Sequence, residues 1–145
     1  DGGHFYICGY ETLGNGASKT FTVVTPNTTK WSHMTFEVDG TQGITFIIKE
    51  GATVSVAGTA TTPINNNRNS ATASVLTIRT GDTFSAEGTQ IYGSHSGANK
   101  TAGMVSREKE IILKQNTAYI FRITNTQTTD TVISYCGEWY EHTNR

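Results

Sequence analysis

The chain has 145 residues, a length that suits one folded domain. Its 11 Lys and Arg nearly balance 12 Asp and Glu, so the formal net charge is −1 at pH 7. Binding to a nucleic-acid duplex requires clustered cations that neutralise phosphates. The sequence has no such cluster, so we do not expect a nucleic-acid partner. It also lacks a run of about 18 consecutive apolar residues, and no membrane span is expected.

Thr and Gly dominate the composition, with 26 Thr and 15 Gly against only 2 Pro. Thr is β-branched and favours strands, whereas Gly favours tight turns. The composition therefore predicts an all-β protein rather than a helical bundle. The sequence opens on Asp1-Gly2-Gly3 without a Met or the shape of a signal peptide. We expect residues 1–145 to form a single domain that follows further N-terminal residues of a longer chain.

Segments of strand-forming residues follow one another along the whole chain, each closed by turn residues. Several alternate between apolar and polar residues; Met34, Phe36 and Val38, for example, would share one face of a strand. Such strands bury one face and expose the other, which is typical of stacked antiparallel sheets. The sequence predicts an antiparallel β-sandwich, and the number of strands favours a jelly roll. We expect strands at residues 5–10, 19–25, 31–38, 44–50, 53–57, 75–79, 83–85, 90–92, 111–113, 117–124 and 131–140.

The same alternation predicts which large side chains form the core. Trp139 has the parity of Tyr135 along its strand and is expected inside, whereas Tyr140 has the opposite parity. Asp39-Gly40 separates two alternating runs and predicts a β-hairpin between them. The predicted core consists of Phe36, Phe46, Ile48, Leu76, Ile78, Tyr119, Phe121, Ile123, Ile133 and Trp139.

The two cysteines, Cys8 and Cys136, lie near opposite ends of the chain. A disulfide framework in a small secreted domain usually holds four or more cysteines, so we expect free, partly buried thiols. A bridge is the alternative if the first and last strands pair and bring the two residues together.

Two long segments interrupt the strand pattern, at residues 58–73 and 93–109. The first is rich in Thr and Asn, and the second in Gly, Ser and charged residues. Connections longer than about 12 residues are uncommon in compact domains and often carry function. The alternative is that both are solvated excursions. The candidate residues for contact with a partner or ligand are Asn66, Arg68, His95, Lys100 and Arg107.

Neither catalysis nor metal binding is predicted. Residues 93–97 have the glycine spacing of a nucleophile elbow, but His95 occupies the place of the nucleophilic Ser. Glu138 and Glu141 lie three apart on a predicted strand, so their carboxylates would face opposite sides. The four histidines show no His-x-His spacing, and the cysteines show no Cys-x-x-Cys spacing. We therefore expect neither an enzyme nor a protein with a cofactor or metal.

Four segments carry a resemblance to a known group of proteins. They are residues 26–31, 63–70 and 112–125 and the C-terminal run Glu138-Trp139-Tyr140-Glu141-His142. Together they resemble small virion proteins of tailed bacteriophages, the head decoration proteins, over nearly the whole chain. The resemblance implies attachment to the outer face of an icosahedral capsid, where the protein would stabilise the expanded shell.

This resemblance also implies partners and a location. The partners would be the major capsid protein and further copies of the chain itself, in a dimer or trimer. The protein would be made in the cytoplasm of the bacterial host and reside on the capsid surface of the virion. Free thiols suit a reducing cytoplasm, and a net charge near zero limits repulsion between crowded copies. The alternative is a carbohydrate- or receptor-binding β-sandwich module of a phage head fibre or tail, with a host surface glycan as ligand.

Overall fold

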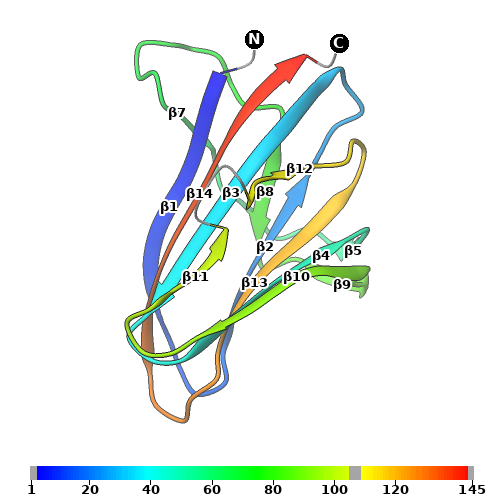
Figure 1. The fold of residues 1–145 in the computed structure, drawn as a ribbon. Coiled ribbons are helices and arrows are strands. Elements are labelled where there is room, and N and C mark those ends of the chain that lie inside the picture. The colour runs from blue at the N-terminus through cyan, green and yellow to red at the C-terminus, as the bar shows by residue number, and fades with distance from the viewer. Residues whose placement is uncertain (1–2, 105–108, 144–145) are drawn as a thin grey trace.

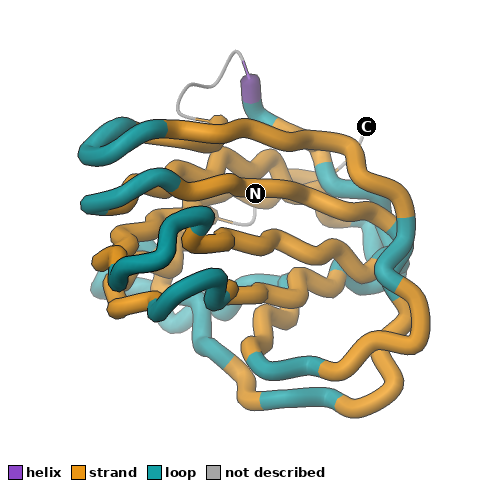
Figure 2. The backbone as a smooth tube through the Cα atoms, turned by 90° about the horizontal axis from the view of Figure 1, so that it is seen from below, coloured by secondary structure: helices purple, strands orange, loops and turns teal. Residues whose placement is uncertain are grey.

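The computed structural model describes residues 3–104 and 109–143, which form two antiparallel β-sheets packed face to face (Figure 1). Strands make up most of this backbone, and loops and turns join them (Figure 2). The predicted antiparallel β-sandwich is confirmed. Within the described ranges, no helix has the length and apolar character needed to cross a membrane.

The first sheet, sheet A, is built around the three longest strands. β14 (Thr131–Thr143) lies at its centre and pairs with β1 (Gly3–Leu13) on one side and β3 (Lys30–Gly40) on the other, so the first and last described strands are neighbours. Sheet A consists, in spatial order, of β11 (Thr101–Met104), β3 (Lys30–Gly40), β14 (Thr131–Thr143), β1 (Gly3–Leu13) and β7 (Ile64–Asn65), and β12 (Ile111–Ile112) also pairs with β3.

The second sheet, sheet B, closes the other side of the core. Sheet B consists, in spatial order, of β10 (Thr89–Ser96), β4 (Ile44–Glu50), β13 (Ala118–Asn125), β2 (Ser18–Val24), β8 (Thr77–Thr80) and β6 (Thr59–Ala60). The chain crosses between the two sheets after β1, β2, β3, β6, β7, β10, β12 and β13. A separate two-stranded ribbon is formed by β5 (Thr53–Val56) and β9 (Thr83–Ala86).

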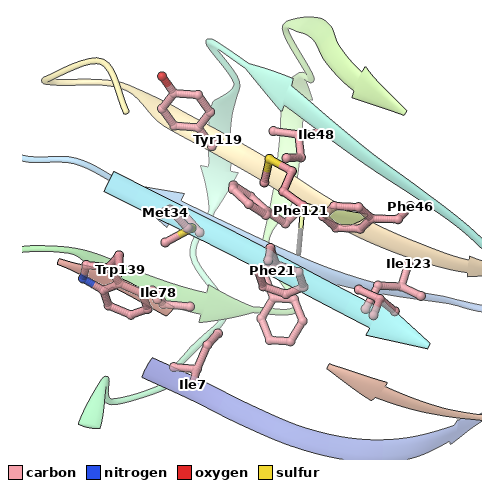
Figure 3. Close-up of a cluster of buried hydrophobic side chains, with 14 of the residues drawn as sticks. Ile7, Phe21, Met34, Phe46, Ile48, Ile78, Tyr119, Phe121, Ile123 and Trp139 are labelled. Carbon is pink, nitrogen blue, oxygen red and sulfur yellow. The ribbon is translucent and has the colours of Figure 1, made fainter. Parts of the chain in front are cut away.

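The core lies between the two sheets and is made of alternate residues of the long strands (Figure 3). All ten predicted core residues are buried, and the most exposed of them, Leu76, is at only 5%. Trp139 is fully buried, and Tyr135 packs against the same cluster while remaining partly exposed. Phe36 of sheet A stacks on Phe46 of sheet B, with ring centroids 5.2 Å apart. Apolar alternation alone therefore identified the inner faces of both sheets.

The hairpin predicted at Asp39-Gly40 is wrong. β3 and β4 belong to different sheets, so the turn after Gly40 carries the chain across the sandwich. The backbone N–H of Thr41 donates to the carbonyl oxygen of Val132, at 3.1 Å. In a hairpin this N–H would have bonded to a neighbouring residue of the turn, but here it bonds to the start of β14. The residues of a turn do not reveal a partner so far along the chain.

The expectation of free thiols is wrong as well, because Cys8 and Cys136 form a disulfide. The two cysteines are directly opposite each other on β1 and β14, with Cα atoms 4.1 Å apart. Opposite residues of antiparallel strands approach this closely at their narrow pairs. Whether the two sulfur atoms meet depends on the pairing of β1 with β14. The number of cysteines in the sequence carries no information about that pairing, so it was a poor guide.

The two segments predicted as long loops are partly strands. Residues 58–73 contain β6 and β7, and residues 93–109 contain the end of β10 and all of β11. β6, β7 and β11 lack the apolar alternation that indicates a strand, and each is held by pairing with a longer strand. Gly103 in β11 has φ +96°, and a Cβ there would lie 2.3 Å from the carbonyl oxygen of Phe36. Only glycine therefore fits the close approach of β11 to β3.

Candidate functional site

The outer face of sheet A, which is turned away from the core, carries many aromatic and imidazole side chains. Successive side chains of a strand point to opposite faces, so the pattern that buries Phe5, Phe36 and Trp139 turns their neighbours outward. The outward side chains are His4, Tyr6, Cys8 and Tyr10 of β1, Trp31, His33, Thr35 and Glu37 of β3, and Val132, Ser134, Cys136, Glu138, Tyr140 and His142 of β14.

At one end of this face, four polar side chains form a connected group that we call the His33 cluster: His33, Glu110, Tyr140 and His142. His33 Nε2 lies 2.6 Å from His142 Nε2, and His33 Nδ1 lies 2.9 Å from Glu110 Oε1. The Tyr140 hydroxyl lies 3.0 Å from His33 Nδ1. The side chains of His33 and Glu110 are only 12% and 17% exposed, so these contacts are shielded from much of the solvent.

Aromatic rings extend the cluster across all three central strands. Tyr140 is paired with His4 of β1 on one side and with His33 of β3 on the other. Its ring stacks on both, with centroid distances of 5.4 Å to His4 and 4.5 Å to His33. Trp31 lies against His142, at 6.4 Å between ring centroids. The rings form a ladder that only the pairing of distant strands could assemble.

Exposed apolar side chains lie elsewhere on the same sheet. Tyr10 is 78% exposed and Val132 is 40% exposed, both on the part of the face beyond the disulfide from the His33 cluster. Ile112, paired with His33, is 50% exposed. Apolar side chains exposed singly are ordinary, whereas a contiguous group of them marks a contact site for another macromolecule, so neighbouring Tyr10 and Val132 are the candidates for such a site.

The outer face of sheet B is different in character, because charged side chains there form ion pairs with one another. Arg122 donates two hydrogen bonds to the carboxylate of Glu87, at 3.0 and 2.7 Å, and Lys49 donates a third at 2.8 Å. These bonds lower the pKa of Glu87 to about 2. Ile120 lies on this face and is nevertheless fully buried. The two outer faces of the sandwich therefore offer a partner quite different chemistry.

The structure does not bring the sequence-predicted contact residues together. Asn66 and Arg68 are exposed on the loop after β7, near the start of β1. His95 is exposed on β10 rather than in a loop, and Lys100 lies in the turn after it, which is hydrogen-bonded to the end of β3 through Asn99. These two groups occupy opposite ends of the sandwich. Arg107 lies outside the described residues.

Asn66 nevertheless borders a hollow of about 530 Å³ near the start of β1. The backbone N–H of Asn66 donates to the carbonyl oxygen of His4, at 2.8 Å, and Asn65 Oδ1 accepts from the N–H of Asn67, also at 2.8 Å. The hollow presents amide and hydroxyl groups that could bind a polar ligand. Its lining consists of Gly3, His4, Asn65, Asn66, Asn67, Ser70 and Thr72.

The functional candidates that sequence reasoning missed are His33, Tyr140 and His142. The one available signal was the alternation of side chains along the strand, which placed Tyr140 on the face opposite to Trp139 and the core. The convergence of His33 with His142 depends on the register between β3 and β14, which lie far apart in the sequence. In the described part of the chain, no three His, Cys, Asp or Glu side chains are arranged to hold a metal ion.

Comparison with known proteins does not add a family to this description. No protein-family model matches the sequence, and no curated protein is significantly similar to it.

Proposed function

We propose that the chain is a structural virion protein of a tailed bacteriophage that decorates and stabilises the outer surface of the capsid. The virion setting rests on the resemblance carried by residues 26–31, 63–70, 112–125 and 138–142. We further propose that attachment uses the outer face of sheet A. The observation that supports this choice is the exposure of Tyr10 and Val132 on one side of a sheet whose other side is the core.

The side chains of this face suit attachment to a protein surface. Tyr and Trp are enriched among the residues that dominate protein–protein binding, because they bury a large area and lose little conformational freedom. Tyr10 is 78% exposed in the isolated chain, so covering it would remove much of a ring from water. The rings of His4, Tyr140 and Trp31 add further contact area at the other end of the face.

We assign the winding of the sandwich to the jelly-roll class. This assignment is supported by the orders β11-β3-β14-β1 and β10-β4-β13-β2 in the two sheets, in which the terminal strands meet and the chain repeatedly crosses the core. Jelly rolls occur in viral capsid domains and in lectins. The winding is therefore compatible with both functions that the sequence suggested.

The proposed location places the protein on the capsid surface after synthesis in the bacterial cytoplasm. A cytoplasm keeps thiols reduced, whereas virions outside the cell meet oxidising conditions. The Cys8–Cys136 disulfide would then form once particles are released. The proposed partners are the major capsid protein and further copies of this chain, in a dimer or trimer, because closed symmetric assemblies suit repeated capsid sites.

The test is co-sedimentation of the purified protein with expanded phage heads that lack it. We expect saturation at a fixed ratio to the capsid subunit. Replacing Tyr10 and Val132 together with Ser should lower the apparent affinity at least about tenfold, which corresponds to a loss of about 1.4 kcal/mol. Ile91→Ser is the matched control, because Ile91 is an exposed strand residue (43%) of sheet B.

Each outcome bears on a separate part of the proposal. Failure to bind any expanded head contradicts the decoration function. Binding that the Tyr10 and Val132 changes leave intact contradicts attachment through sheet A and leaves decoration standing.

A second candidate function, glycan binding by a fibre or tail module, is favoured by the hollow beside His4 and residues 65–72. Its amide groups could hydrogen-bond to sugar hydroxyls, and the His4 and Tyr140 rings lie nearby. A glycan array tests it directly. Binding that is lost in Asn66→Ala but retained in Tyr10→Ser would favour this function over decoration.

A further inference from the structure

Two imidazole nitrogens meet on the outer face of sheet A. His33 lies on β3 and His142 on β14, and because His33 is paired with Tyr140, the two histidines are diagonal neighbours on one face. Their Nε2 atoms are 2.6 Å apart, closer than an ordinary hydrogen bond from an N–H group. What lies between these atoms therefore depends on which ring nitrogens carry hydrogen.

The partners of the other two ring nitrogens decide that question. His142 Nδ1 lies 3.1 Å from the backbone carbonyl oxygen of Thr143, which can only accept, so this nitrogen carries a hydrogen. His33 Nδ1 lies 2.9 Å from Oε1 of Glu110, and an ionised carboxylate also only accepts. The Tyr140 hydroxyl lies 3.0 Å from the same nitrogen and donates its hydrogen to Glu110 Oε1, so it does not supply a hydrogen to His33 Nδ1. With both imidazoles neutral, each has a single N–H, at Nδ1, so both Nε2 atoms direct lone pairs at each other. Two such lone pairs repel unless a cation lies between them.

We propose that His33 and His142 bind a divalent transition-metal ion of the Zn²⁺, Ni²⁺ and Cu²⁺ class through their Nε2 atoms. Imidazole is a preferred ligand of these ions. A histidine that binds a metal almost always donates its other N–H to a carboxylate, a backbone carbonyl or water. His33 does so toward Glu110, and His142 does so toward the Thr143 carbonyl.

The geometry requires only a small adjustment to admit the ion. Zinc–nitrogen bonds of about 2.0–2.1 Å at a tetrahedral angle place the two nitrogens about 3.3 Å apart. Neither histidine is fully buried, so a small rotation of each ring can supply the extra separation. The carboxylate of Glu110 next to His33 offsets part of the positive charge of the ion.

This chain supplies two ligands, so the site is open. Among the residues that the structure describes, no third His, Cys, Asp or Glu converges on the same point. Water or a donor from a docked molecule would fill the remaining positions, as in sites that exchange ligands rather than closed structural ones. The inference rests on His33 and His142 alone and does not depend on the proposed function.

The direct test is titration of the purified, chelator-treated protein with ZnCl₂ and NiCl₂ in a calorimeter. We expect one ion per chain, and His33→Gln and His142→Gln should each weaken binding at least about tenfold. His95→Gln is the matched control, because it removes an exposed histidine of sheet B and should leave binding unchanged. Glu110→Gln should weaken binding less, because it alters only the partner of His33 Nδ1.

A measurement on the unaltered chain keeps the test independent of how the variants fold. Nitrogen-15 NMR of the two imidazoles should show both Nε2 resonances shifting on addition of Zn²⁺ while both Nδ1 atoms stay protonated. The proposal is overturned if Zn²⁺ moves neither resonance, or if His33→Gln and His142→Gln bind as tightly as the unaltered protein. A proton shared between the Nε2 atoms that persists at saturating Zn²⁺ would overturn it as well.

Discussion

Glu141 shows how a single buried carboxylate is accommodated at the end of the sandwich. Its side chain is only 2% exposed, and it accepts hydrogen bonds from the Trp139 indole N–H, at 2.9 Å, and from the backbone N–H of Val75, at 3.2 Å. The Ser74 hydroxyl donates to the same carboxylate. A charge buried without such donors would strongly destabilise the fold. These bonds also tie the segment that leads into β8 to the end of β14.

We therefore expect Glu141→Ala to lower the free energy of unfolding by about 2–4 kcal/mol, because one buried and two partly buried donors lose their acceptor together. Urea denaturation followed by circular dichroism measures this change. Ser134→Ala, at an exposed position on the same strand, should alter the free energy by no more than about 0.5 kcal/mol. Equal effects of the two substitutions would contradict the role assigned to Glu141.

The core aromatic residues offer a second test at the same scale. Phe121 is fully buried, and its ring lies 5.3 Å from that of Phe36 in the opposite sheet. Phe121→Ala should lower the free energy of unfolding by about 3–5 kcal/mol, through lost burial and the cavity that remains. Ile91→Ala, at an exposed site, serves as the control in the same denaturation series. A loss below about 1 kcal/mol would show that the inner face of β13 is misassigned.

Among the elements, the segment between β9 and β10 is held to sheet B by charge. Glu87 lies in that segment and accepts from Arg122 of β13 and Lys49 of β4. Its pKa falls from 4.5 to about 2, first because of the bonds from Arg122 and then because of that from Lys49. Because the pKa is lower in the folded chain, the stabilisation is complete above pH 4.5 and is lost as the pH falls toward 2.

Glu87→Gln should therefore be less stable than the unaltered protein at pH 7 and equally stable near pH 2. The expected difference at pH 7 is about 1 kcal/mol, because the Glu87 side chain is 37% exposed and solvent screens the pairs. Thermal unfolding at several pH values measures the difference. Glu11→Gln, which removes a single ion pair with Lys19 where Glu87 has two cationic partners, is the control and should have a smaller effect. A pH-independent difference would contradict the charge-based explanation.

The disulfide joins Cys8 of β1 to Cys136 of β14, which are 128 residues apart in the chain. Linking β1 to β14 restricts the unfolded chain, which should stabilise the folded state by about 2–4 kcal/mol. Cys8→Ser combined with Cys136→Ser should therefore unfold at lower urea concentration than the oxidised protein. Thiol labelling of the denatured, non-reduced chain should detect no free cysteine. Full labelling would show that the thiols stay free.

At the scale of the whole molecule, β14 completes the fold. It pairs with β1 and β3 along nearly its full length and brings Ile133 and Trp139 into the core. The central strand of sheet A is thus far along the chain from both of its partners. Sheet A cannot form until β14 is available, and its pairings span large sequence separations, which slows folding.

A chain that ends at residue 130 should consequently fail to fold. We expect it to lack a cooperative unfolding transition and to give poorly dispersed amide resonances in NMR spectra. A synthetic peptide of residues 131–145 added in trans should restore both properties, whereas the same peptide carrying Trp139→Ala should not. A truncated chain that unfolds cooperatively would show that β14 is dispensable.

Features set by residues close together in the sequence were predicted correctly, whereas features set by contacts between distant segments were not. Alternating residues such as Phe46 and Ile48 identified the long strands and their buried faces, because burial of one face imposes that pattern directly. β7 and β11 were missed because they are short and form by pairing with β1 and β3. The candidate contact residues were chosen from loop composition, and the structure places Arg68 and His95 at opposite ends.

The amino-acid sequence by itself determined the all-β class, the long strands and the core, since each follows from the alternation of side chains along one segment. Only the tertiary structure decided that β1, β14 and β3 lie side by side. That arrangement joins Cys8 to Cys136 and brings His33 next to His142. It also makes the turn after Gly40 a connection between the two sheets instead of the expected hairpin. The physical reason is that the register between strands far apart in the sequence is set by the packing of the whole sandwich, which no local pattern contains.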